Sequence, residues 1–95
     1  MNTCDKGAKH ELLAAAWLLE QGYQVFRNVS PAGPVDLVAF DTETGEIVLI
    51  DVKTGTNMYD TNKLKPEQED MGVRRLVYNP HKKTFVLEVF RKSAL

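Results

Sequence analysis

Residues 33–53 read GPVDLVAFDTETGEIVLIDVK, two apolar stretches separated by a short polar link, and this segment decides the fold. Successive side chains of a strand face opposite sides of a sheet. Asp51 and Lys53 are therefore expected on one face, and the apolar residues that alternate with them on the other. The link 41–45 has a glycine at its end, which predicts a hairpin of two antiparallel strands.

Each strand of this hairpin carries one carboxylate where its neighbours are apolar. Asp36 lies in the first strand and Asp51 near the end of the second. Antiparallel pairing puts the start of one strand beside the end of the other, so the two carboxylates are expected to be neighbours at one edge of the sheet. Carboxylates brought that close repel each other unless a cation lies between them. The sequence therefore predicts a cation site at this edge.

Composition indicates one small globular domain. The chain has 95 residues, of which 43% are hydrophobic, and we expect a single domain over residues 1–95. It has neither an apolar run of roughly twenty residues nor a basic leader followed by an apolar stretch, so we expect a cytoplasmic protein without a membrane span. The lone Cys4 excludes an internal disulfide and a CxxC zinc site. A net charge of −1 does not by itself indicate a nucleic-acid partner.

Periodicity and cap residues predict the element order α-β-β-β-α-β-β. The expected helices cover residues 5–21 and 66–71, ended by Gly22 and Gly72. The expected strands cover residues 23–29, 35–40, 46–53, 73–78 and 84–90. The polar segment 54–65 is expected to be a mobile loop. This order predicts an α/β fold in which helices flank a central mixed sheet.

Glu11 is a further acidic candidate. It lies three, four and seven positions before Ala14, Ala15 and Leu18, which puts all four side chains on one side of the first helix. Its carboxylate is then expected to point toward the sheet. A solvated glutamate favoured by the dipole at the helix start is the alternative.

Basic and hydroxyl side chains near these acids are candidates for nucleic-acid contacts. They are Arg27, Ser30, Lys63, Lys65, Arg74 and Arg75. For Ser30, which precedes a Pro-Ala-Gly-Pro turn, the alternative is a turn-forming serine.

The acids and the lysine together match a known motif. Its parts are Glu11, Pro34-Val35-Asp36 and Asp51-Val52-Lys53. This set resembles the PD-(D/E)xK nuclease superfamily, with an aspartate as the second acid. Three further segments are most similar to archaeal Holliday-junction resolvases and small virus-type replication-repair nucleases: Lys6-Gly7, Gly33-x-x-Asp36 and Leu64-Lys65-Pro66-Glu67-Gln68. The resemblance spans most of the chain and implies a restriction-endonuclease-like fold.

The resemblance also implies how the site works. Asp36, Asp51, the Val52 carbonyl and Glu11, directly or through water, would bind magnesium or manganese, hard cations that prefer oxygen ligands. Lys53 would orient the attacking water and stabilise charge that develops on the phosphate. By the same resemblance, Gln68 would hold the water or a phosphate oxygen. The alternatives are a simple ion pair between Asp51 and Lys53 and an ordinary surface position for Gln68.

Two functions are compatible with these residues. The first is a metal-dependent endonuclease that hydrolyses DNA, with the selectivity for junctions that the resemblance implies. The second is a catalytically silent nuclease fold that binds DNA as a structural subunit. The intact set of acids and lysine favours the enzyme, because a binding module gains nothing from buried carboxylates that repel each other.

The chain is expected to act as a homodimer. One site cuts only one strand, and a subunit of net charge −1 offers few surplus positive charges for binding phosphates. A symmetric dimer would supply a second site and cover the outer strand edge near Phe85, Leu87 and Val89.

Overall fold

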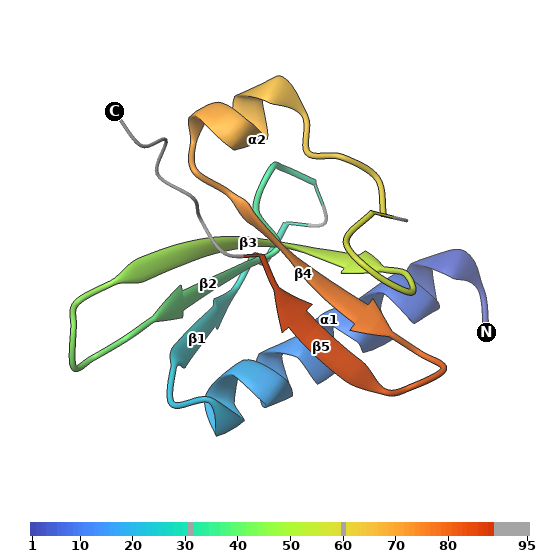
Figure 1. The fold of residues 1–95 in the computed structure, drawn as a ribbon, viewed down its shortest axis with the longest axis horizontal. Coiled ribbons are helices and arrows are strands. Elements are labelled where there is room, and N and C mark those ends of the chain that lie inside the picture. Colours follow the sequence, from blue (N-terminus) through green and yellow to red (C-terminus); the bar gives the residue numbers. More distant parts are fainter. Residues whose placement is uncertain (31, 60, 89–95) are drawn as a thin grey trace.

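The computed structural model of the chain describes residues 1–30, 32–59 and 61–88 (Figure 1). The elements follow the expected order: α1 (Thr3–Glu20), β1 (Gln24–Arg27), β2 (Leu37–Phe40), β3 (Ile47–Thr54), α2 (Pro66–Asp70), β4 (Arg74–Asn79) and β5 (Thr84–Leu87). The last residues of the strand expected over 84–90 lie outside the described part of the chain.

The strands form one five-stranded mixed sheet in the order β1-β2-β3-β4-β5. The pairs β1–β2, β2–β3 and β4–β5 are antiparallel, while β3 and β4 run parallel. A parallel pair needs a long crossover connection, and the segment that contains α2 provides it (Figure 1). The α/β fold with a central mixed sheet is therefore confirmed.

Helix α1 lies across one face of the sheet and builds the core with it (Figure 1). The buried apolar residues shared between helix and sheet are Ala14, Leu18, Leu37, Ala39, Val48, Ile50 and Leu76. Fully burying a leucine, isoleucine or valine side chain stabilises the fold by about 1.5–3 kcal/mol. This face of the sheet thus carries the main apolar contribution to stability.

The opposite face is covered much less. Helix α2 lies over one end of it, and Phe26 and Ile47 remain 57% and 63% exposed. Because Val48 and Ile50 are buried against α1, strand alternation turns Asp51 to the other side, as the sequence predicted. Asp51 and Lys53 therefore lie on the face that α1 does not cover.

Both helices end at glycines, but α1 begins earlier than expected. The helix starts at Thr3 and not at residue 5, and Asn2 is its N-cap, because the Asn2 side chain accepts a hydrogen bond of 2.8 Å from the Asp5 backbone N–H. Gly22 and Gly72 follow the helices with φ of 96° and 77°, a conformation that glycine adopts without strain. No helix within residues 1–30, 32–59 and 61–88 combines the length and apolar character that a bilayer crossing requires.

The segment after β3, expected to be a mobile loop, is tied to the sheet. Thr61 is only 8% exposed, and its hydroxyl donates to the Met58 carbonyl at 3.1 Å. Arg75 of β4 donates to both the Met58 carbonyl and the Thr61 hydroxyl at 3.0 Å. These contacts fix the turn that precedes Lys63 and Lys65.

Candidate active site

Asp36 and Asp51 lie opposite each other across the β2–β3 hairpin. Leu37 pairs with Ile50 in the sheet register, and the Asp36 N–H donates to the Ile50 carbonyl at 2.8 Å. The residue before Leu37 is therefore opposite the residue after Ile50. The neighbourhood that antiparallel pairing predicted is present.

The pair is electrostatically strained. Burial is the main cause that raises the pKa of Asp36 from 3.8 to about 6, and the carboxyl groups of Asp51 and Glu11 act in the same direction against one opposing hydrogen bond. That bond comes from the Val52 backbone N–H, which donates to Asp36 Oδ2 at 2.7 Å. The Asp36 carboxyl is thus held by β3 but resists losing its proton.

Asp51 keeps one buried oxygen without a hydrogen bond. Its Oδ2 accepts no hydrogen bond from the described residues, although Lys53 Nζ forms an ion pair with it at 3.1 Å. The simple ion pair weighed from the sequence therefore exists but leaves the carboxylate incomplete. A buried oxygen in this condition is costly in a protein and suits a bound cation.

Gln68 links α2 to both acid-bearing segments. Its side-chain oxygen accepts from the Lys65 backbone N–H at 2.9 Å, and its amide donates to the Pro34 carbonyl at 2.9 Å and to Asp51 Oδ1 at 3.5 Å. Gln68 is only 7% exposed, so its interpretation as an ordinary surface residue is wrong. It holds α2 against the residues around the carboxylate pair.

Asn28 is a residue that the sequence analysis missed. Its side-chain amide donates to the carbonyls of Ala32 and Val35 at 3.2 and 2.9 Å, and its oxygen accepts from the Ser30 N–H at 2.9 Å. Asn28 thereby closes the turn that leads into Asp36. The Asn-x-Ser pattern before Pro-x-Gly-Pro is typical of such a turn and could have indicated it.

Ser30 contributes to the same turn. Its Oγ accepts a hydrogen bond of 3.3 Å from the Ala32 N–H, as expected of the turn-forming serine weighed from the sequence. Ser30 is exposed and lines a cavity together with Asp36.

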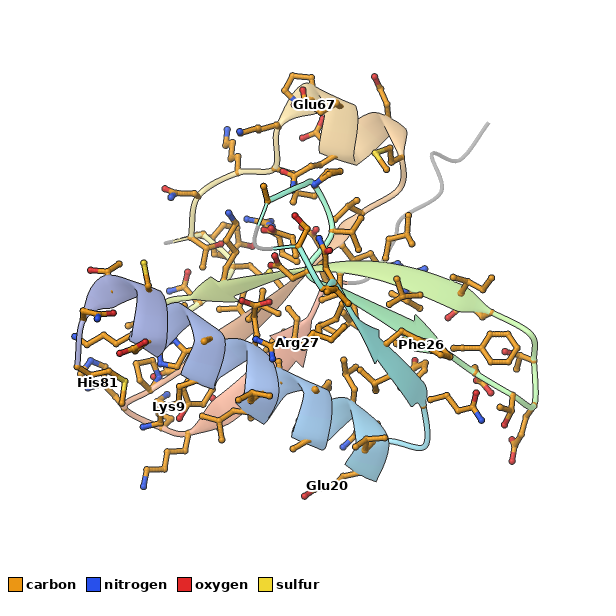
Figure 2. The ribbon with its side chains drawn as sticks, turned by 180° about the vertical axis from the view of Figure 1, so that it is seen from behind. Lys9, Glu20, Phe26, Arg27, Glu67 and His81 are labelled. Carbon is orange, nitrogen blue, oxygen red and sulfur yellow. The ribbon has the colours of Figure 1, made fainter. Side chains whose placement is uncertain are left out.

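The acid pair lies between two cavities. One, of about 560 Å³, lies between α1 and the turn after β1 and contains Glu11, Arg27 and Asp36. Figure 2 shows Arg27 beside α1. The other, of about 510 Å³, contains both lysines of the tied segment; its lining includes Asp51, Lys53, Lys63, Lys65 and Gln68. Asp36 therefore lines one cavity and Asp51 the other, and each cavity also contains cationic side chains.

Arg75 is committed to the fold. Its guanidinium pairs with Glu88, and it also holds Met58 and Thr61. Burial alone would raise the pKa of Glu88, but the hydrogen bonds and charge of Arg75 outweigh it and lower the pKa. Of the two arginines proposed for nucleic-acid contacts, Arg75 thus has its donors occupied by the protein. Arg74 lines a third cavity, together with Lys63.

The described carboxylates would supply only part of the ligand set of a bound cation. Among residues 1–30, 32–59 and 61–88, no three His, Cys, Asp or Glu side chains converge on one point. Glu11 therefore does not complete a ready-made set of three carboxylate ligands, although its charge reaches Asp36. A bound cation would relieve the repulsion between the two carboxylates and would contact the Asp51 oxygen that accepts no hydrogen bond.

The fold is that of the restriction-endonuclease-like class. The solved structure of a bacterial homing endonuclease, I-Ssp6803I, is similar with a TM-score of 0.69 over 93% of this chain and 69% of that chain, at 18% identity. Residues 10–76 match the model of the Uncharacterised protein family UPF0102, and the chain belongs to this family. The matched range contains Glu11, Asp36, Asp51, Lys53 and Gln68.

A relative within the family supports this assignment. A UPF0102 protein from Caulobacter sp. (strain K31) is 37% identical over 54 residues, which cover 55% of this chain and 37% of that protein. The chain thus spans well under half the length of this relative.

Proposed function

We propose that the protein is a metal-dependent endonuclease that hydrolyses phosphodiester bonds in DNA. The carboxylate pair carries this proposal, because a buried Asp51 oxygen without a hydrogen bond lies beside Asp36, whose pKa is about 6. Such strain has no benefit for a purely structural hairpin. The nuclease-like fold supports the same reaction class.

Asp36 and Asp51 would hold magnesium or manganese, with the Val52 carbonyl as a neutral ligand and Glu11 acting through water. These ions prefer oxygen ligands and commonly retain several waters, which suits a site with only two adjacent carboxylates. When bound, the ion would polarise the scissile phosphate and acidify a water molecule.

The chain's own residues position the reacting groups. Lys53 Nζ lies 3.1 Å from Asp51 Oδ2, and in this proposal it would hold the attacking water and stabilise negative charge on the phosphate. The Val52 N–H fixes the orientation of Asp36. The Gln68 amide, bonded to Pro34 and near Asp51, restrains α2 and the carboxylate together.

The DNA path would follow the cavities on either side of the pair. Lys63 and Lys65 lie on the Asp51 side and Arg27 on the Asp36 side. We further propose a single nuclease domain that acts in the cytoplasm as a homodimer with resolvase-like selectivity for branched DNA. A second copy would bring a second site and cover the β5 edge at Phe85 and Leu87, and Val89 of that edge lies outside the described residues.

Plasmid cleavage tests the proposal. The purified protein is incubated with supercoiled plasmid and with matched junction, flap and duplex oligonucleotides in magnesium or manganese, with EDTA and the Asp51→Asn variant as controls. We expect nicking that depends on metal and on Asp51. DNA binding without cleavage above the Asp51→Asn background would overturn the proposal in favour of a catalytically silent subunit.

A further inference from the structure

A third cavity, of about 780 Å³, lies next to the candidate active site and has no part in the proposed hydrolysis. Its walls come from the segment after β3, the end of α2 and the adjacent ends of β4 and β5. Lys63 lines both this cavity and the one that contains Asp51. The two cavities therefore share Lys63 as a lining residue, and a molecule that occupies one lies beside the other.

An aromatic ring is presented at this cavity on a fixed turn. Tyr59 is 96% exposed, yet its backbone N–H donates to Asn57 Oδ1 at 2.8 Å. The preceding Met58 carbonyl accepts bonds of 3.0 and 3.1 Å from Arg75 and Thr61. The backbone is thus held in place while nearly all of the ring surface faces solvent. A ring displayed in this way suits stacking of a planar group.

The rest of the lining favours an uncharged planar ligand. Apolar side chains form much of the wall, including Leu64, Leu87 and Val73, of which Val73 is only 4% exposed. Of the charged residues in the wall other than Lys63, Arg75 pairs with Glu88, and Glu69 and Arg74 carry opposite charges. An uncharged heterocycle would fit this surface, and an attached phosphate would fit Lys63 at the boundary with the acid pair.

We propose that this cavity binds one unpaired nucleobase of the substrate, stacked on Tyr59, with an adjacent phosphate at Lys63. This inference rests on the proposed nuclease function and narrows its substrate class. A base within a continuous duplex has both faces covered and must unstack before it can enter a pocket. The preferred substrate is then a nucleic acid with an unpaired nucleotide next to the cut, as in a bulge, flap or junction.

Fluorescence of 2-aminopurine tests the cavity separately from catalysis. The fluorescent base is placed in two otherwise matched DNA oligonucleotides, unpaired in a bulge or paired in a continuous duplex, and the full-length protein is added with calcium in place of magnesium. We expect quenching of the bulged probe with the wild type and with Tyr59→Phe, which keeps the ring. Tyr59→Leu should lose the quenching and bind the bulged probe about tenfold more weakly, with duplex affinity unchanged.

A second variant guards against a local effect of changing Tyr59. Val86 lines the cavity but is 53% exposed, so Val86→Trp should fill the space without disturbing the core and should weaken bulge binding in the same way. Thermal melts of each variant check the fold.

The outcomes separate this inference from the function on which it rests. Equal bulge affinities in the wild type, Tyr59→Leu and Val86→Trp, or no quenching with the wild type, would overturn the cavity assignment. Cleavage of continuous duplex as fast as bulged DNA in magnesium would also overturn it while leaving the nuclease intact. Absence of all metal-dependent cleavage, with base-specific quenching retained, would overturn the nuclease proposal alone.

Discussion

Two carboxylate–cation pairs lie on the same face of the sheet and are built differently. Asp51 pairs with Lys53 on β3, while Glu88 pairs with Arg75 on β4, and Asp51 and Arg75 are direct neighbours in the β3–β4 register. Glu88 accepts two side-chain hydrogen bonds from the guanidinium and has a lowered pKa. Asp51 Oδ2 accepts none from the described residues. The Arg75–Glu88 pair is thus completed by hydrogen bonds within the protein, whereas the Asp51–Lys53 pair leaves one carboxylate oxygen without a hydrogen bond.

The difference separates an ion pair whose carboxylate is saturated by hydrogen bonds from one whose carboxylate is not. Hydrogen bonds to a charged group each contribute about 1.5–3 kcal/mol, so a saturated pair stabilises the chain. A buried carboxylate oxygen that accepts no hydrogen bond, such as Asp51 Oδ2, lowers the stability of the chain. We therefore expect changes at the first pair to affect activity and changes at the second to affect stability.

The largest expected effect is the loss of cleavage on removing either acid. Asp36→Asn and Asp51→Asn should each reduce the cleavage rate by at least about 100-fold, because changes merely around metal ligands already cost about 10–100-fold. Metal-free thermal stability should stay level or rise, since like-charge repulsion is relieved. Glu20→Gln, on the exposed surface of α1 (Figure 2), is the matched control. Wild-type rates in either aspartate variant would contradict the ligand assignment.

Removing the Lys53 ammonium group should lower the cleavage rate without lowering the affinity for metal. Lys53→Ala is expected to slow single-turnover cleavage by about 100-fold, because it removes a group that stabilises charge on the phosphate. Metal affinity, measured by calorimetric titration, should persist because the ammonium is not a ligand. Loss of metal binding, or undiminished cleavage, would remove the role assigned to Lys53.

The structural pair should respond in the opposite way. Arg75→Ala is expected to lower the free energy of unfolding by about 2 kcal/mol, because it leaves the partly buried Glu88 and the 58–61 turn without their donor. Urea titration measures this decrease, and Glu88→Gln with the double variant completes a cycle that isolates the pair. If Arg75→Ala and Lys53→Ala lowered the free energy of unfolding by equally small amounts, the contrast between the two ion pairs would be contradicted.

A smaller effect concerns pH. The pKa of Asp36 is about 6 in the folded protein against 3.8 ordinarily, so the folded state binds more protons than the unfolded state between these values. The stability that Asp36 contributes through this extra proton binding is fully present below pH 4 and is lost as the pH rises through 6. Metal-free Asp36→Asn should therefore exceed the wild type in stability at pH 7.5 and lose that advantage at pH 4. Because Asp36 is partly exposed, the advantage of Asp36→Asn in free energy of unfolding at pH 7.5 is about 1 kcal/mol. Melting temperatures at both pH values measure it, and a pH-independent difference would contradict the assignment.

The smallest effect is expected on replacing Lys63 or Lys65, which line the cavity that contains Asp51. Removing one cation that binds a phosphate lowers the slope of log affinity against log salt by about one, so Lys63→Ala and Lys65→Ala should each flatten it. Fluorescence anisotropy of a labelled duplex at several salt concentrations gives the slopes. Arg75→Lys is the control, because the guanidinium is already bound within the protein. Unchanged slopes in both lysine variants would move the DNA path to the Arg27 side.

The sequence predicted the structural features that form between residues close together in the chain. Strand alternation and the short hairpin link placed Asp36 beside Asp51, because both signals arise within one hairpin. It did not predict the bond from Gln68 to Pro34, 34 positions away, which needs the placement of α2 on the sheet. The Arg75–Glu88 pair was missed for a related reason, since residues 13 positions apart become partners only through the β4–β5 register. The sequence predicted DNA contacts from the basic residues. Only the packing shows that one of them, Arg75, already has its donors bound within the protein.

The parallel pairing of β3 with β4 also has a consequence for the order of folding. Strands β1, β2 and β3 pair through short antiparallel connections, whereas β4 reaches β3 only after the long segment with α2 has closed. Contacts that are near in sequence form fastest, so the three-stranded meander is expected to precede the crossover. Gln68 belongs to the late segment, and its amide reaches Pro34 only when that segment docks. Backbone amide exchange should therefore report opening of residues 61–73 well before that of β2 and β3. Such an opening would release the Gln68 restraint while most of the sheet remained folded.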